Sequence, residues 1–295
     1  MRLADFARIA GFEVWRDHEF LTPGFLSDPQ PSMLTFLDHA RFLPSVCRTP
    51  EVVCVITTPE LAARLESVPG LAATQNPRYA FALLHNHLAA ETDFYWAGFA
   101  TEIDASARVH PRAFVAERNV RIGPGCVIEP NATVLERSLV GEGAVVRSGA
   151  VLGAEGFQVV RVGGGFIDMV HAGGIELKEG VRVLCGAVLS PAFFRQATTI
   201  GPSTRVGNLV HLSHNVRIGA RCRIGHGSMV NGYVTIGDDV WIGPGSTIAN
   251  GVCIGSGASV SLGSAVISDV QPGVRVTGNV AVEHRRFLRH IASLK

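Results

Sequence analysis

Aliphatic residues recur at every sixth position along the carboxy-terminal part of the chain. The pattern runs without a slip through Ile200, Val206, Leu212, Ile218, Ile224, Val230, Ile236, Ile242, Ile248, Ile254, Val260 and Val266. The residue four places after each of these anchors, as far as Val260, is small or β-branched. A six-residue period suits neither a helix nor a long strand, and it predicts short strands joined by turns that stack as a solenoid. Glycine follows several anchors, which indicates turns that need a permissive φ or a close approach of backbones.

The same period begins earlier in the chain, and two irregular segments interrupt it. The earlier anchors are Ile103, Val109, Val115 and, after one extra residue, Ile122, Ile128, Val134, Val140, Val146 and Leu152. Residues 153–174 break the period and are predicted to leave the solenoid as a loop, and a second irregularity spans Leu189 to Ile200. Long excursions from a rigid scaffold are places where binding residues concentrate.

The amino-terminal part of the chain has no such repeat. An apolar, β-branched run at 51–58 is followed by helical-looking stretches at 59–67 and 77–91, both of which begin at a proline. This alternation predicts a small α/β domain ahead of the solenoid. The predicted divisions are an α/β domain over 1–100, a β-solenoid over 101–272 and a tail with a short basic helix over 273–295, so the fold class is mainly β.

Composition narrows the environment and the partners. A chain of 295 residues is long enough for two cores. Glycine, proline or charge interrupts every apolar run before the roughly 18 residues of a membrane helix, so no transmembrane segment is expected. The first residues do not resemble a signal peptide, and the scattered cysteines are typical of a reduced, cytoplasmic protein. With a net charge of +1 and no basic stripe, nucleic acid is not an expected partner.

His214 is the first candidate for chemistry. It lies two residues after the anchor Leu212, where the repeat turns outward, and the residues 18 and 36 positions later are Gly232 and Asn250. If three repeats make one coil, these residues stack on one corner. A base, an approachable backbone N–H and an amide are the groups that acyl transfer from a thioester to an amine needs. The alternative is that His214 is an ordinary polar residue of a turn.

Two motifs carry a family resemblance. "LGAEGF" (152–157) and "HLSHNVRIG" (211–219) resemble the UDP-3-O-acylglucosamine N-acyltransferases and their relatives that acylate nucleotide-linked amino sugars. The resemblance implies a left-handed parallel β-helix, a homotrimer, His214 as general base and Gly232 as an oxyanion N–H donor. It also implies acyl-CoA or acyl carrier protein as co-substrate, with no metal and no permanently bound cofactor.

The resemblance extends to binding residues. "LTFLDHARFL" (34–43) is similar to the family segment that holds uracil between two rings, which implies Phe36 and Phe42, with His39 where an asparagine is usual. An aromatic slot suits a planar base, although both phenylalanines fit a core equally well. "HAGG" (171–174) implies a substrate contact by His171, and Asn250 is a further candidate.

The acyl donor has weaker candidates. "GDDVWIG" (237–243) resembles coils of coenzyme A-using relatives, which implies a donor contact by Trp241. Arg285 and Arg286 are candidates for phosphates of coenzyme A or for acyl carrier protein. A surface aromatic at a subunit contact and a solvated helix face are the alternatives.

Departures from the family pattern shape the functional prediction. The second family histidine falls at about Asn250 or Gly251, "SPAFF" (190–194) replaces a D-R-G stretch, and the terminal helical extension is short. We therefore expect an N-acyltransferase acting on a nucleotide-linked amino sugar for a surface polysaccharide or lipopolysaccharide. The alternative is the lipid A enzyme, which uses a 3-hydroxyacyl carrier protein.

Two other functional classes fit parts of the sequence. A γ-type zinc carbonic anhydrase also uses this kind of solenoid, and His211, His214 and His226 invite the comparison. However, His211 occupies the last place of its repeat, so its side chain is expected to point differently from the other two. A non-enzymatic spacer leaves the resemblance to nucleotide-binding segments unexplained.

Overall fold

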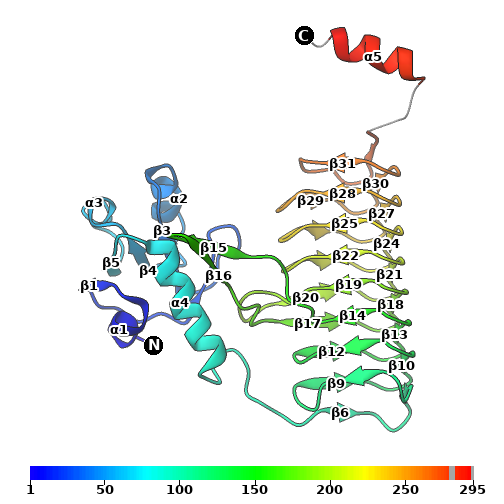
Figure 1. Cartoon of the computed structure of the whole chain (residues 1–295), viewed down its shortest axis with the longest axis horizontal. Coiled ribbons are helices and arrows are strands. Elements are labelled where there is room, and N and C mark those ends of the chain that lie inside the picture. The colour runs from blue at the N-terminus through cyan, green and yellow to red at the C-terminus, as the bar shows by residue number, and fades with distance from the viewer. Residues whose placement is uncertain (279–282, 294–295) are drawn as a thin grey trace.

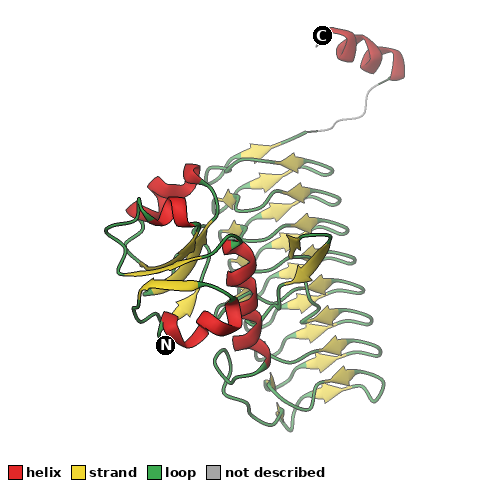
Figure 2. Ribbon diagram, turned by 60° about the vertical axis from the view of Figure 1, so that its left-hand side comes forward, coloured by secondary structure: helices red, strands yellow, loops and turns green. Residues whose placement is uncertain are grey.

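The computed structural model describes residues 1–278 and 283–293, so part of the predicted tail lies outside the described residues. It contains an α/β domain packed against one side of a long solenoid (Figures 1 and 2). None of the described helices has the length and apolar character needed to span a membrane.

The amino-terminal domain is built on a five-stranded sheet in the order β1-β5-β4-β3-β2, with β1 antiparallel to β5 and the other neighbours parallel. Its elements are η1 (Leu3–Phe6), α1 (Ala7–Ala10), β1 (Glu13–Arg16), β2 (Thr22–Pro23), β3 (Met33–Leu37), η2 (Ala40–Phe42), α2 (Leu43–Arg48), β4 (Val52–Thr57), α3 (Pro59–Ala62), β5 (Gly70–Ala73) and α4 (Pro77–Ala90). The helix expected at 59–67 is shorter than predicted. It ends in i→i+3 bonds from Arg64 and Leu65, because the chain turns back to enter β5.

The solenoid consists of three parallel sheets, which confirms the prediction from the six-residue period. We name each sheet by one strand. The β22 sheet contains β8 (Phe114–Val115), β11 (Thr133–Val134), β14 (Val151–Leu152), β19 (Val188–Leu189), β22 (His211–Leu212), β25 (Met229–Val230), β28 (Thr247–Ile248) and β31 (Ala265–Val266). The β23 sheet contains β6 (Glu102–Ile103), β9 (Val120–Ile122), β12 (Ser138–Val140), β17 (Gly174–Leu177), β20 (Ala197–Ile200), β23 (Arg217–Ile218), β26 (Thr235–Ile236) and β29 (Cys253–Ile254). The β24 sheet contains β7 (Arg108–Val109), β10 (Val127–Ile128), β13 (Val145–Val146), β18 (Arg182–Val183), β21 (Arg205–Val206), β24 (Arg223–Ile224), β27 (Trp241–Ile242), β30 (Ser259–Val260) and β32 (Arg275–Val276).

Each coil adds one strand to each sheet, so residues 18 positions apart become neighbours where the repeat is regular. His211, for example, pairs with Met229, which pairs with Thr247. The anchors point inward and form one continuous core, in which Leu212, at 0% exposure, is typical. Burial of this aliphatic column is the main driving force for stacking the coils.

The turns have two distinct backbone requirements. The third residue after an anchor often adopts the left-handed conformation, as in Asn215 with φ 56° and Tyr233 with φ 61°. The glycine directly after an anchor serves close approach instead, because a Cβ at Gly201 would lie 2.4 Å from the carbonyl group of Gly219 in the next coil.

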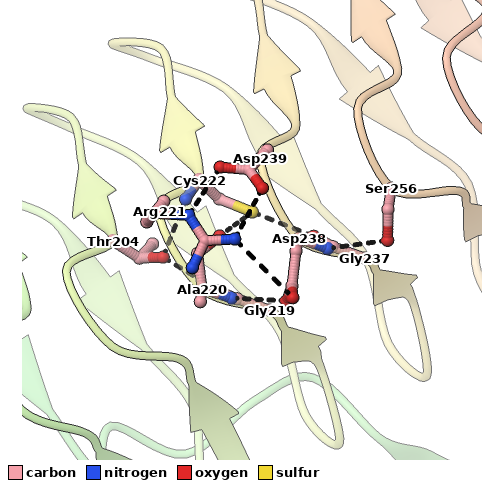
Figure 3. A network of polar contacts seen from close by, with 9 residues as sticks. All are labelled: Thr204, Gly219, Ala220, Arg221, Cys222, Gly237, Asp238, Asp239 and Ser256. Carbon is pink, nitrogen blue, oxygen red and sulfur yellow. Dashed lines mark hydrogen bonds and ion pairs between the residues drawn. The ribbon is translucent and has the colours of Figure 1, made fainter.

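Side chains also connect successive coils at the corner between the β23 and β24 sheets (Figure 3). The Thr204 hydroxyl donates to Gly219 O at 2.8 Å and accepts from Cys222 N at 3.0 Å. One coil further on, Asp238 accepts from Ala220 N at 2.8 Å. Asp238 N in turn donates to the Ser256 hydroxyl at 3.1 Å. The "GDD" segment thus has a structural role in this corner.

The two irregular segments join the solenoid to the amino-terminal domain. The first forms an antiparallel hairpin of β15 (Val159–Val162) and β16 (Gly165–Asp168), which reaches toward the amino-terminal domain in Figure 1. The second, 190–196, buries Phe193 and Phe194 in the aromatic core of the amino-terminal domain. Arg217 on β23 also donates to Asp28 at 2.9 Å. The described part of the tail ends with α5 (His284–Ser293).

Candidate active site

His214 lies on the turn between β22 and β23. Leu212 fixes the register of this turn by pointing into the core, and Asn215, which is fully buried, fixes its exit. The Asn215 side-chain oxygen accepts a hydrogen bond from Phe193 N at 3.0 Å. The turn that carries His214 is therefore tied to the irregular segment 190–196.

The His214 ring is surrounded by other rings. Its centroid lies 4.4 Å from that of Phe193, 5.1 Å from that of Tyr233 and 5.7 Å from that of His171. The side chain is 7% exposed, and its Nδ1 has no hydrogen-bond partner among the described residues. The imidazole thus points outward from the solenoid core into a small aromatic site formed by several elements.

Gly232 lies directly against this imidazole, as the 18-residue offset predicts. A Cβ at Gly232 would lie 2.2 Å from His214 Cε1 and 2.5 Å from His214 Nε2. Only glycine therefore leaves the ring in place.

The same corner leaves backbone donors unpaired. At several other turns of the solenoid, the N–H two places after an anchor donates to a side chain one coil on, as Ala220 N does to Asp238 and Asn208 N does to His226. Gly232 offers no side chain to His214 N. Gly232 N itself has no hydrogen-bond partner within the described residues. A free N–H next to an imidazole is the arrangement that stabilises a developing oxyanion.

Burial sets the charge of His214. Desolvation lowers its pKa to about 4, against the opposing effect of the Asn215 side chain, and the charge of His211 lowers it further. An imidazole with this pKa is neutral at neutral pH and able to accept a proton.

The structure brings His171 to the same site. It follows the β15–β16 hairpin, is 3% exposed, and stacks on Phe193 with centroids 4.2 Å apart and planes inclined by 27°. Burial lowers its pKa to about 3, with smaller contributions from the charges of His214 and His85.

Three rings of this site were not assigned from the sequence. Phe193 and Tyr233 contact His214, and Phe25 contacts both of these rings at centroid distances of 5.7 and 6.4 Å. The two adjacent phenylalanines at 193 and 194 lie within a break of the repeat, and this was the only sequence signal for Phe193. Tyr233 sits at an otherwise ordinary turn position, where the sequence carries no such signal.

Phe36 and Phe42 line a cleft of about 270 Å³ between the amino-terminal domain and the irregular segment 153–174. The lining residues are Phe25, Leu26, Ser27, Thr35, Phe36, Asp38, Phe42, Arg78 and Gln158. Phe36 meets Phe25 edge to face, and the Arg78 guanidinium lies 5.4 Å from the Phe36 ring centre. The Nδ1 of His39 accepts from Arg41 N at 3.1 Å and caps η2, so a substrate contact by its other ring nitrogen stays a prediction.

The remaining candidates lie on other elements. Asn250 is exposed on the turn after β28, two coils from His214 on the same corner. Trp241 belongs to the β24 sheet, where the Arg223 guanidinium lies 5.0 Å from its ring centre. Arg285 and Arg286 are exposed on α5. Among the described residues of the single chain, none of these four side chains contacts His214.

The histidines of the zinc comparison are spread over different elements. His226 lies on the corner between the β24 and β22 sheets, where its Nδ1 accepts from Asn208 N at 2.8 Å. Among the described residues of one chain, no group of three or more potential ligands is placed to hold a metal ion.

Comparison with known proteins identifies the class. The family model of the bacterial transferase hexapeptide, with six repeats, matches residues 119–154, 197–232 and 233–266. The solenoid is therefore the left-handed parallel β-helix of hexapeptide transferases, as the resemblance implied. Solved structures with similar folds include an Arabidopsis UDP-N-acetylglucosamine acyltransferase, with 20% identity over 64% of this chain and 76% of that chain and a TM-score of 0.48. A Francisella novicida UDP-N-acetylglucosamine acyltransferase has 19% identity over 64% of this chain and 73% of that chain, with a TM-score of 0.44.

Curated relatives define the family. The UDP-3-O-acylglucosamine N-acyltransferase of Azorhizobium caulinodans is 33% identical over 302 residues, which cover 92% of this chain and 84% of that protein. The UDP-3-O-acylglucosamine N-acyltransferase of a Caulobacter species is 29% identical over 228 residues, which cover 65% of this chain and 62% of that protein. The chain belongs to the UDP-3-O-acylglucosamine N-acyltransferase family. It is an N-acyltransferase that acts on a nucleotide sugar, which confirms the predicted class of enzyme.

Proposed function

We propose that this chain transfers an acyl group from a thioester donor to the amine of UDP-3-O-acylglucosamine, a reaction of lipid A synthesis. The observation that carries this proposal is the 33% identity, over 92% of the chain, with a relative of that name. The same identity favours the lipid A enzyme, the alternative predicted from the sequence, over an enzyme of surface-polysaccharide synthesis. The replaced second histidine and the "SPAFF" segment then become variations within one family.

The geometry at His214 supports a direct transfer. The acceptor amine attacks the thioester carbonyl, so that a C–N bond forms and the carbonyl oxygen becomes an oxyanion. The neutral imidazole of His214 takes the amine proton, and the unpaired Gly232 N–H donates to the oxyanion. When the intermediate collapses, the C–S bond breaks and the imidazolium returns the proton to the thiolate.

The aromatic cleft supports binding of the nucleotide. Phe36 and Phe42 both line this cleft, where aromatic rings suit a planar base, and the Arg78–Asp38 ion pair supplies polar groups at the same cleft. The donor is an acyl carrier protein or coenzyme A thioester, with Trp241, Arg285 and Arg286 as the proposed contacts. A homotrimer, as the family resemblance implies, is the proposed working state, and the scattered free cysteines favour a cytoplasmic location.

Product analysis tests the proposal. We expect the purified protein to acylate UDP-3-O-acylglucosamine with a 3-hydroxyacyl carrier protein or acyl-CoA, as seen by the product mass. UDP-, dTDP- and GDP-amino sugars without the 3-O-acyl group are the comparison acceptors. If the protein acylates only the acceptors without the 3-O-acyl group, the proposal is wrong and an enzyme of surface-polysaccharide synthesis is indicated.

The variant His214→Ala tests the mechanism in the same assay. We expect kcat to fall by about 10²-fold or more, because a positioned general base contributes roughly that factor. Circular dichroism and oligomer mass should match the unaltered protein. Turnover close to that of the unaltered protein would remove His214 as the base.

A further inference from the structure

Tyr233 has a backbone conformation that favours glycine. Its φ is 61°, in the left-handed region that bulky side chains rarely adopt. One coil further on, the same corner position is Gly251, with φ 71°, so the turn itself needs no side chain. Strained residues persist where their surroundings hold them, and they concentrate at functional sites. The ring of Tyr233 is therefore expected to make contacts that outweigh this backbone cost.

The ring of Tyr233 contacts the proposed base. Its centroid lies 5.1 Å from that of His214, and the two planes are inclined by 74°, an edge-to-face arrangement that aromatic rings favour. Tyr233 N also donates to His214 O at 3.0 Å, so the backbone and the ring both contact the same residue. Phe25 of the amino-terminal domain contacts the same tyrosine ring, with centroids 6.4 Å apart. Tyr233 thus connects His214 with the packing of the amino-terminal domain.

Three neighbours from different elements confine the imidazole of His214. The Phe193 ring, from the segment 190–196, lies 4.4 Å from it between centroids. The backbone of Gly232 adjoins its edge, because a Cβ there would lie 2.5 Å from Nε2. The Tyr233 ring is the third neighbour. Phe193 is fully buried, whereas Tyr233 is half-buried, so loss of the tyrosine ring is expected to admit water to the imidazole.

The hydroxyl of Tyr233 takes no part in these contacts. Its oxygen is buried and has no hydrogen-bond partner among the described residues. Burial raises the pKa of this hydroxyl, the charge of Asp28 raises it further, and the charge of Arg217 opposes both. The group is therefore neutral in the working pH range. Removal of the hydroxyl alone should leave the contact with His214 intact.

We propose that Tyr233 is a positioning residue, whose ring holds the imidazole of His214 beside the Gly232 N–H and shields it from water. This inference rests on the proposed function in one respect, namely that His214 is the general base. A ring that fixes the base acts on the chemical step more than on acceptor binding, so its loss lowers kcat more than it raises the acceptor KM.

The surroundings of His214 predict a shift of its pKa when the ring is lost. Burial is the main cause that lowers this pKa to about 4, the Asn215 side chain opposes it, and the charge of His211 adds to it. The other titratable groups around the imidazole are His171 and Tyr233. A substitution of Tyr233 leaves both histidines in place and reduces the burial. The pKa of His214 should therefore rise toward its ordinary value of 6.5.

Tyr233→Gly and Tyr233→Phe test this role together. Glycine adopts the left-handed backbone without strain, so Tyr233→Gly should fold. We expect its kcat to fall by about tenfold, because a small displacement of reacting groups can cost up to about 10²-fold. Its kcat should also fall further as the pH decreases from 8 to about 5.5, since more of the base is then protonated. Tyr233→Phe should keep the kcat and the pH profile of the unaltered enzyme.

Arg221→Gly is the matched control. Arg221 occupies the equivalent turn position at another corner, with φ 57°, and its side chain is 58% exposed. This variant also removes a large side chain at a left-handed position, and it should leave kcat and the pH profile unchanged. The assignment is overturned if Tyr233→Gly keeps the pH profile of the unaltered enzyme. It is also overturned if Tyr233→Phe loses as much kcat as Tyr233→Gly, because the hydroxyl would then be the important group.

A histidine titration gives a readout that needs no turnover. NMR spectra of the protein with isotope-labelled histidine, assigned with His214→Ala, should show His214 titrating near pH 4 in the unaltered protein and at higher pH in Tyr233→Gly. Equal pKa values in the two proteins would contradict the shielding role. A different acceptor leaves this titration unaffected. If the unaltered enzyme acylates only another amino sugar, the proposed function fails, and the kinetic comparison of the Tyr233 variants is decided with that acceptor.

Discussion

The imidazoles of His214 and His171 lie among aromatic rings, and this burial lowers the pKa of His214 to about 4 and that of His171 to about 3. In the unfolded chain both groups return to about 6.5. As the pH falls below 6.5, these two histidines therefore bind protons in the unfolded chain but not in the folded chain. The free energy of unfolding must decrease through this window, which ends where the folded groups titrate.

Denaturant unfolding at pH 7, 6 and 5 should show this loss directly. Each such histidine contributes a slope of about 1.4 kcal/mol per pH unit between its two pKa values. His171→Phe removes one of these groups while keeping a ring in the stack. Its free energy of unfolding should depend less steeply on pH than that of the unaltered protein. Parallel curves for the two proteins would show that His171 does not stay neutral in the folded state.

At the level of elements, the solenoid corners combine buried and exposed polar contacts that differ in how much they stabilise the fold. Thr204 is fully buried and makes two hydrogen bonds to the next coil. Arg221 and Asp239 form an ion pair in the same corner, but their side chains are 58% and 53% exposed. Figure 3 shows both contacts within one network.

Thr204→Val should therefore destabilise the solenoid far more than Asp239→Asn. Valine keeps the shape of threonine but leaves the buried Cys222 N–H without its partner, at a cost of about 1–3 kcal/mol. Asparagine tolerates the left-handed backbone of residue 239, and an exposed ion pair contributes about 0–1 kcal/mol. Chemical denaturation of the two variants measures the difference. Equal losses would mean that the exposed pair is as important as the buried hydroxyl.

The elements also show what the sequence determines. An anchor such as Leu212 has to be inside, so the six-residue period predicts the strands, and the 18-residue offset predicts that Gly232 contacts His214. The repeat does not predict that His214 contacts His171 and Phe193. Both partners lie on irregular segments, whose paths are set by packing against the amino-terminal domain.

Over the whole molecule, Phe25 connects the two parts of the proposed site. It lines the cleft with Phe36 and Phe42, and its ring also contacts Phe193 and Tyr233, which flank His214. Its position comes from the amino-terminal domain, whereas those two rings come from the solenoid. The packing of Phe25 is therefore expected to align the nucleotide with the acyl-transfer chemistry.

Substitution of two cleft residues should separate these roles. Phe42→Ala removes a ring that lies at the outer part of the cleft, 37% exposed, and should raise only the KM for the nucleotide sugar. Phe25→Ala should raise that KM and also lower kcat, because the rings beside His214 lose a packing partner and a small displacement of reacting groups can cost up to about 10²-fold. Steady-state kinetics with the acceptor varied measures both parameters. If Phe25→Ala leaves kcat unchanged, the two parts of the site work independently and the aromatic core serves only to join the domains.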